Sequence, residues 1–300
     1  MKGKRIFVVG SSNTDMVVKS AQLPRPGETI LGGVFLMNAG GKGANQAVAA
    51  ARLGGDVTFV AKVGKDAFGA QSLEGFMKEG IQTRYVLVDD THPSGTALIM
   101  VNEEGENCIV VAPGANASLL PADLLSVTEM KEAAVILMQL EIPMETIEAV
   151  KRIAMGNHQR VMINPAPAQS LSDELLTGLF LITPNESEAE LLTGIPVTEM
   201  ASASRAADFF LNKGVENVVI TMGKQGAYFK NGSTSFMLPA PVVRAVDTTA
   251  AGDTFSGALT VAITEGMDWE QAIRFAVKAA SLSVTRMGAQ ASVPYRSEIQ

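Results

Sequence analysis

Short apolar runs alternate with helical stretches along most of this 300-residue chain, and this alternation limits the possible folds more than any other feature. The first run, Ile6 to Gly10, is typical of a buried strand, and the alanine-rich segment 45–53 is typical of a helix packed on a sheet. Further strands are expected at 57–60, 134–140, 161–164, 179–183 and 217–221, with helices at 67–79, 144–154, 186–192 and 201–213. Such alternation predicts an α/β fold with a mainly parallel central sheet between helices.

Two stretches, 16–37 and 94–111, break this alternation. Both have period-two patterns and turn residues without an intervening helix, and Glu103 to Asn107 has the composition of a hairpin turn. They predict a small separate β-sheet, although a β extension that only stabilises the main sheet gives the same pattern. Because no repeat or linker divides the sequence, we expect a single domain.

The composition indicates which kinds of binding partner and which cell compartment fit this chain. The chain is 47% hydrophobic, has a net charge of −7 and a pI near 5.0, and this acidity disfavours nucleic acid or an anionic membrane as a partner. Cys108 is the single cysteine, which excludes an intrachain disulfide and fits a reducing compartment. The apolar run at Ile6 to Val9 is too short for a signal peptide, and no segment approaches transmembrane length. We expect a cytoplasmic protein with a small-molecule ligand.

The segment Ala245 to Gly257 places small residues and a carboxylate where a loop becomes a helix. Ala250, Ala251 and Gly252 leave backbone N–H groups open at the positive end of the helix, which suits an anion. Asp253, in the first turn, is positioned to take a proton from a hydroxyl beside that anion. The alternative is a plain helix start in which Asp253 or Thr249 only caps free N–H groups.

A second glycine turn, Asn38 to Ala47, again leads into an alanine-rich helix, and Asn13-Thr14-Asp15 follows the first strand. Together with Asp247 to Phe255, these segments closely resemble the ribokinase branch of the ribokinase/PfkB family of carbohydrate kinases, from Val8 to about Pro294. The resemblance implies a ribokinase-like three-layer fold. It also implies one kinase domain over 1–300, a β-sheet lid formed by about 13–38 and 92–112, and a homodimer through the lid.

The resemblance further implies ATP-dependent phosphorylation of D-ribose at O5. Asp253 would be the general base, and the backbone of Ala250, Ala251 and Gly252 would stabilise the transferring phosphoryl group. Two alternatives stay open: a family kinase for deoxyribose, fructose or a nucleoside, and a catalytically silent sugar-binding protein.

The sugar contacts of the family map onto Asn13, Asp15, Gly41, Lys42, Asn45 and Glu141, besides Asp253. Asn13 and Asp15 follow the first strand, where α/β sheets place ligand groups, and a carboxylate there accepts hydrogen bonds from a sugar diol. Asn45 alone is also explained as a helix-start residue, and Glu141 as a solvated loop carboxylate.

Nucleotide contacts are implied at Asn185, Glu188, Thr221, Gly223, Gly226, Gly252 and Val277. Asn185 and Glu188 match a family element that organises Mg²⁺ and phosphates, largely through water, although a surface helix start looks similar. The segment 221–226 is also explained as a hairpin turn. No P-loop motif is present, and Val277 is apolar where family members often carry a polar residue.

The family also uses a monovalent cation, usually K⁺, held mostly by backbone carbonyls. The matching positions here are Asp247, Thr249, Ser283, Arg286, Gly288 and Ser292. His92 and His158 lack metal-ligand spacing, so zinc chemistry is not expected.

Overall fold

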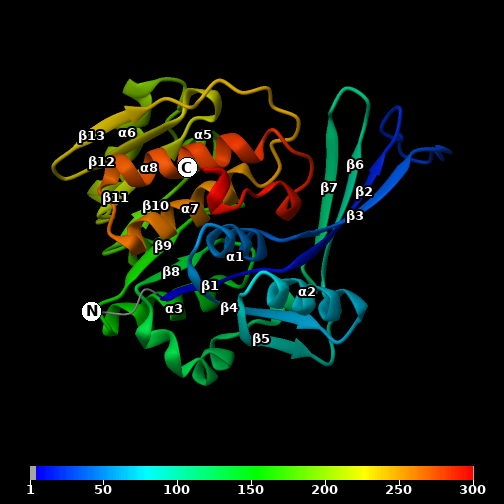
Figure 1. Cartoon of the computed structure of the whole chain (residues 1–300), viewed down its shortest axis with the longest axis horizontal. Coiled ribbons are helices and arrows are strands. Elements are labelled where there is room, and N and C mark those ends of the chain that lie inside the picture. Colours follow the sequence, from blue (N-terminus) through cyan, green and yellow to red (C-terminus); the bar gives the residue numbers. More distant parts are fainter. Residues whose placement is uncertain (1–4, 300) are drawn as a thin grey trace.

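The structure, a computed structural model that describes residues 5–299, has three layers with a nine-stranded sheet in the middle (Figure 1). The strand order is β13-β12-β11-β10-β9-β8-β1-β4-β5. Seven strands are parallel: β1 (Arg5–Val9), β4 (Asp56–Gly64), β5 (Gln82–Asp89), β8 (Val135–Met138), β9 (Arg160–Ile163), β10 (Leu181–Ile182) and β11 (Asn217–Thr221). β12 (Ala227–Asn231) and β13 (Ser235–Leu238) add an antiparallel edge. The predicted mainly parallel sheet is confirmed.

Helices cover both faces because the central strands are apolar on both sides. In β1, Ile6 and Val8 join one hydrophobic core, whereas Phe7 and Val9 join the other. The first core holds α1 (Lys42–Arg52), α2 (Ala67–Lys78), α7 (Ala251–Glu265) and α8 (Trp269–Ser283). The second holds α3 (Met144–Gly156), α4 (Asp173–Leu176), α5 (Glu186–Thr193) and α6 (Met200–Asn212). Within residues 5–299, no helix combines the length and apolar character needed to cross a membrane.

A second sheet of four strands projects from this body (Figure 1). Its order is β3 (Val34–Gly40), β2 (Asn13–Lys19), β6 (Gly95–Val101) and β7 (Asn107–Ala112). The expected hairpin lies between β6 and β7, where the Asn102 N–H donates to the Glu106 carbonyl at 3.0 Å. Residues 20–33 form no strand, in contrast to the expected strand content of 16–37. Pro24, Pro26 and several glycines there cannot sustain a ladder.

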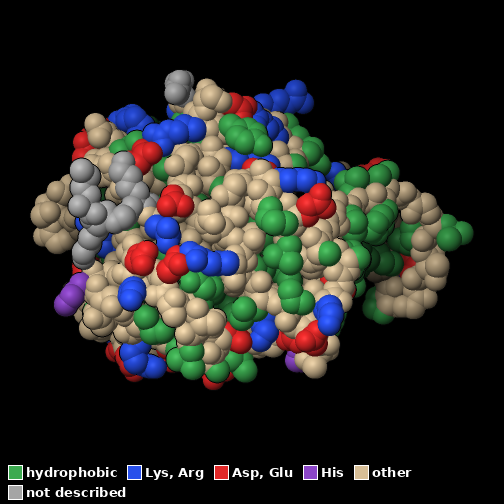
Figure 2. Space-filling view, turned by 60° about the horizontal axis from the view of Figure 1, so that its bottom comes forward, with side chains coloured by type: hydrophobic (Ala, Val, Ile, Leu, Met, Phe, Trp, Pro, Cys, Tyr) green, Lys and Arg blue, Asp and Glu red, His purple; other side chains and the backbone are tan. Residues whose placement is uncertain are grey.

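Hydrophobic side chains gather on the projecting part of the molecule (Figure 2). None of the six residues of β7 is buried, and Val110 is 67% exposed. Phe35 in β3 and Leu98 in β6 are 60% and 55% exposed. The small sheet therefore differs from the central sheet in having apolar residues that no other part of the described chain covers.

Candidate active site

Polar side chains gather where the parallel strands end. Ser11 to Asn13 follow β1, Gln139 and Glu141 follow β8, Asn164 follows β9, and Thr183 and Asn185 follow β10. The carboxyl ends of parallel strands share one edge of the sheet, which is where α/β folds place ligands. Helices α1 and α7 also begin at this edge, so their N-terminal N–H groups face the same space.

A cavity of about 190 Å³, here named the anion cavity, lies at the start of α7. Its lining includes Lys42, Asn185, Glu188, Thr221 and residues 250–253. Ala250 adopts a left-handed conformation with φ of 59° and precedes the helix. This turn directs the Ala251 N–H to the Thr248 carbonyl at 3.2 Å, so Ala251 is not a free donor as the sequence suggested. The N–H groups of Gly252 and Asp253 have no backbone acceptor within residues 5–299.

Asp253 is 6% exposed and its carboxylate is held by two amides. Asn45 Nδ2 donates to Asp253 Oδ2 and Gln46 Nε2 donates to Asp253 Oδ1, each at 2.9 Å. Neither Asp253 nor Thr249 caps α7, because the Thr249 hydroxyl donates to Asp247 Oδ1 and the helix has no side-chain cap. The capping alternative for this segment is therefore wrong, and a buried, oriented carboxylate stands beside the anion cavity.

Lys42 is the first residue of α1, and its ammonium group interacts with the carboxylates described below. Gly41 precedes it with φ of 86°, a conformation that brings the chain within reach of the Asn13 backbone. Burial by itself lowers the pKa of Lys42, but the charges of Asp253, Glu141, Glu188 and Asp15 outweigh it and raise that pKa. The lysine thus stays positive in the site.

Glu141 is not a solvated loop carboxylate. Its Oε2 accepts the Ser11 hydroxyl and the Lys42 backbone N–H, the latter at 2.9 Å. This contact places a negative charge at the positive end of α1 and ties the loop after β8 to the glycine turn.

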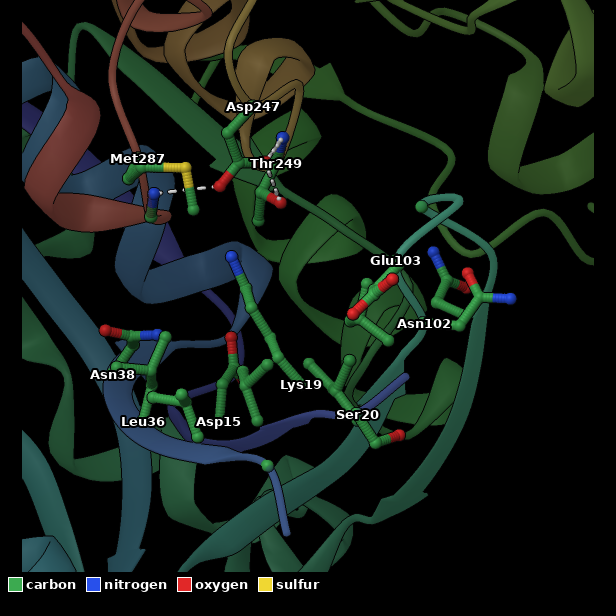
Figure 3. Close-up of a pocket in the computed structure, with 18 of the residues that line it drawn as sticks. Asp15, Lys19, Ser20, Leu36, Asn38, Asn102, Glu103, Asp247, Thr249 and Met287 are labelled. Atoms are coloured by element: carbon green, nitrogen blue, oxygen red, sulfur yellow. Dashed lines mark hydrogen bonds between the residues drawn. The ribbon is translucent and has the colours of Figure 1, made fainter. Parts of the chain in front are cut away.

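A second cavity of about 1160 Å³ lies between the small sheet and the body and is here named the sheet cavity. Asp15, Lys19 and Asn38 line its small-sheet side, whereas Asp247, Thr249 and Met287 line the body side (Figure 3). Thr248 lines both the sheet cavity and the anion cavity, so the two spaces adjoin.

Asp15 is the carboxylate of the sheet cavity that lies nearest the other acidic groups. Burial raises its pKa to about 6; Glu141 and Asp253 add to this rise and Lys42 opposes it. Asn13, on the same strand, is 5% exposed and accepts a hydrogen bond from Asn116 Nδ2 at 2.7 Å. The Asp15 carboxylate therefore faces the sheet cavity and can meet a polar ligand there, whereas Asn13 lines neither of the two cavities.

The predicted nucleotide residues are only partly brought together. Asn185 and Glu188 form a reciprocal capping box at the start of α5, and both line the anion cavity beside Thr221. Burial raises the pKa of Glu188, whereas the Asn185 N–H and the Lys42 charge oppose that rise.

Three other predicted nucleotide residues lie elsewhere. Gly223 and Gly226 form the turn between β11 and β12, and Val277 is buried in the first core on α8. None of these three lines either cavity.

Of the residues predicted for a monovalent cation, Thr249 and Gly288 contact the Asp247 carboxylate. Asp247 Oδ1 accepts the Thr249 N–H at 2.9 Å and Oδ2 accepts the Gly288 N–H at 2.8 Å. Across residues 5–299, the carbonyls of Asp247, Thr249, Arg286 and Gly288 receive no backbone hydrogen bond, which leaves four oxygens free. Ser283 and Ser292 are fully buried, and their hydroxyls donate to the Ala280 and Ala289 carbonyls.

No group of three or more His, Cys, Asp or Glu side chains forms a metal cluster in the described part of the chain.

Several residues of the site were not anticipated from sequence: Ser11, Asn38, Gln46, Asn116, Gln139, Asn164, Thr183 and Ser256. Gln139, Asn164 and Thr183 directly follow the observed strands β8, β9 and β10, so the rule that selected Asn13 also applies to them. The predicted strands, 134–140, 161–164 and 179–183, included these residues and so hid that position. Asn116 has no such signal, because it lies on a short 3-10 helix (Gly114–Ser118) remote in sequence from Asn13.

Comparison with known proteins agrees with this architecture. A ribokinase from Haemophilus influenzae is 44% identical over 98% of this chain and 97% of its own length. The crystal structure of a ribokinase from Thermotoga maritima has a TM-score of 0.89 and 39% identity, covering 98% of this chain and 97% of that one. An Arabidopsis thaliana ribokinase solved with ribose and ATP has a TM-score of 0.89 and 34% identity, over 98% and 96% of the two chains.

The model of the pfkB carbohydrate kinase family matches residues 4–296, nearly the whole sequence. The glycine turn before α1 and the Ala250 to Asp253 segment, which first indicated this family, lie within the match and meet at one site. The chain therefore belongs to the pfkB family of carbohydrate kinases.

Proposed function

We propose that this protein transfers the γ-phosphoryl group of ATP to O5 of D-ribose, giving D-ribose 5-phosphate and ADP. The observation that carries the proposal is the buried Asp253 carboxylate beside open helix N–H groups, where the sheet cavity meets the anion cavity. The ribokinase relatives, one of them solved with ribose and ATP, support ribose as the acceptor.

In this mechanism the sugar occupies the sheet cavity and the triphosphate occupies the anion cavity. Asp253 takes the proton of the O5 hydroxyl as O5 bonds to the γ-phosphorus. The bond from that phosphorus to the bridging oxygen breaks, and its electron pair leaves with ADP. The N–H groups of Gly252 and Asp253 stabilise the charge on the transferring group. Asn13, Asp15, Lys42, Asn45 and Glu141 are the residues assigned to holding and orienting the sugar side of the site.

Mg²⁺ would supply charge neutralisation on the phosphates. The residues suited to it are Asn185 and Glu188, since the Glu188 carboxylate lines the anion cavity and only its Oε2 is used by the capping box. The four free carbonyls around Asp247 suit K⁺, which prefers oxygen ligands, and we propose K⁺ activation on that ground. Equal turnover with K⁺ replaced by Tris would contradict the cation site.

The small sheet is proposed to be the sugar lid, formed by about 13–38 and 92–112 within one domain, and to pair with a second lid in a homodimer. The exposed apolar residues Phe35, Leu98 and Val110 support this, because an uncovered apolar face favours association. A cytoplasmic location stays a prediction from the sequence.

The test is an ADP-release assay with ATP, Mg²⁺ and K⁺ across ribose, deoxyribose, fructose and adenosine. The expected result is the highest kcat/KM for ribose. Preference for another acceptor would keep the mechanism and change the substrate. Absence of turnover on all four, with ribose binding measurable by calorimetry, would favour a silent sugar-binding protein.

A further inference from the structure

Three buried amide side chains lie behind Asp253 and are joined to it by hydrogen bonds. Gln46, on α1, donates from Nε2 to Asp253 Oδ1 at 2.9 Å and to Asn164 Oδ1 at 3.0 Å. Gln139 donates from Nε2 to Gln46 Oε1 at 2.6 Å. Gln46 and Gln139 are fully buried and have no exposed area through which a ligand could touch them.

The orientation of every amide in this series is fixed by groups that can only accept hydrogen bonds. Asn164 Nδ2 donates to the Thr183 carbonyl at 2.9 Å, so Asn164 must present its oxygen to Gln46. Gln46 therefore presents its NH₂ group to both Asn164 and the Asp253 carboxylate. Its own oxygen then faces Gln139, which must donate. A flip of Gln46 would set an oxygen against the Asp253 carboxylate and leave two NH₂ groups in contact.

A neutral amide is a better hydrogen-bond partner for a general base than a charged side chain is. Gln46 is neutral at all working pH values, so it neither takes the proton nor forms an ion pair that would suppress the basicity of Asp253. Its N–H fixes the direction of Oδ1 while Asn45 fixes Oδ2, and each oxygen keeps a further lone pair for the sugar hydroxyl.

We propose that Gln46 is the positioning residue of the Asp253 base, and that Gln139 holds the Gln46 amide in its donating orientation. This inference rests on the proposed kinase function. The catalytic consequence is that the carboxylate reaches the transition state already oriented.

The first test is Gln46→Met, which keeps the size of the side chain and removes its donors. The expected result is a fall in kcat of about 10- to 100-fold, the size associated with one hydrogen bond to a charged group. KM for sugar and ATP should stay within about twofold.

Two further variants should lower kcat by more and by less than Gln46→Met does. Gln46→Glu has nearly the same shape but places a second carboxyl group against Asp253, so the fall in kcat should exceed that of Gln46→Met. Gln139→Met leaves the Gln46 donor in place and only frees its orientation, so it should act in the same direction with a smaller fall. It also serves as the test if both Gln46 variants fail to fold.

The matched control is Gln159→Met. Gln159 is a half-buried amide that, like Gln46, donates two hydrogen bonds, but its acceptors are the Met130 and Ala133 carbonyls, away from the site. Gln159→Met should leave kcat unchanged even if the Tm falls. If the wild-type chain phosphorylates a sugar while Gln46→Met and Gln46→Glu keep its kcat, or lose only Tm, the inference is overturned. A wild-type chain without transfer would instead overturn the proposed function.

Discussion

The two sheets of this protein are both apolar, yet their side chains meet opposite environments. In the central sheet, Val8 in β1 and Leu137 in β8 are fully buried between helices. In the small sheet, Val110 is 67% exposed and every residue of β7 is exposed. The central sheet completes its burial within the chain, whereas the small sheet leaves apolar area for something outside it to cover.

Because of this difference, we expect the two regions to have different roles in the proposed reaction. The edge of the central sheet holds Asp253 by buried amide hydrogen bonds, which suits precise chemistry. The small sheet joins the body near β2 and β6 and has a large cavity on its inner side, which suits movement over a ligand. The predictions that follow test each side of the comparison, from the largest effect to the smallest.

Asp253→Asn tests the chemistry of the body and should have the largest effect. The amide keeps the size of the side chain but cannot accept the proton, so kcat should fall about 10²- to 10⁴-fold. ATP and ribose binding, measured by calorimetry, should be retained. Near-normal kcat would show that Asp253 is not the base.

The double variant Ile109→Lys/Val110→Lys tests the small sheet. Adjacent strand residues point to opposite faces, so one lysine enters the proposed interface whichever face pairs. Both positions are exposed, at 54% and 67%, so the fold should tolerate the change. We expect the dimer dissociation constant to rise at least about 100-fold by analytical ultracentrifugation, since an unpaired buried charge is costly. An unchanged dimer would exclude this sheet as the interface.

Gly43→Ala tests how tightly the glycine turn packs. A Cβ there would lie 2.5 Å from the Ser11 nitrogen and 2.6 Å from the Gly10 carbonyl carbon, so backbone must shift. We expect a loss of about 1–3 kcal/mol in the free energy of unfolding, measured by urea titration.

Gly75→Ala is the matched control for that variant. Gly75 lies in α2, and a Cβ there meets nothing within 4 Å. Alanine should stabilise the helix by about 0.5–1 kcal/mol. Equal effects of the two substitutions would contradict the close approach of α1 to the strand end.

Asp15→Asn tests the charge at the junction of the two regions. Burial raises the pKa of Asp15 to about 6, so the folded state loses stability as pH rises from about 4 through 6 and the carboxyl group ionises. Removing the charge should therefore stabilise the unliganded protein by roughly 1–3 kcal/mol at pH 8 and not at pH 4. A difference in unfolding free energy that does not change with pH would contradict the assigned cause.

Much of the fold and part of the site follow from local patterns. The apolar runs predict the parallel strands because a strand buried on both faces needs continuous apolar residues. The two edge strands of the main sheet, β5 and β13, were not anticipated, since polar and apolar residues mix in both. The segment 250–253 predicts a helix start with an anion site from its small residues alone, although the bond from Ala251 to Thr248 was not foreseeable.

The sequence by itself determined the alternating elements, the family, and the position of Asp253 in the first turn of a helix, because each depends on neighbouring residues. Only the tertiary structure decided which side chains hold that carboxylate. Asn45 and Gln46 are 208 and 207 residues away from it, and Gln139 reaches Gln46 across 93. Contacts at such separations exist only once the strand order places β8 beside β1 and β9 beside β8, and no local pattern specifies that order.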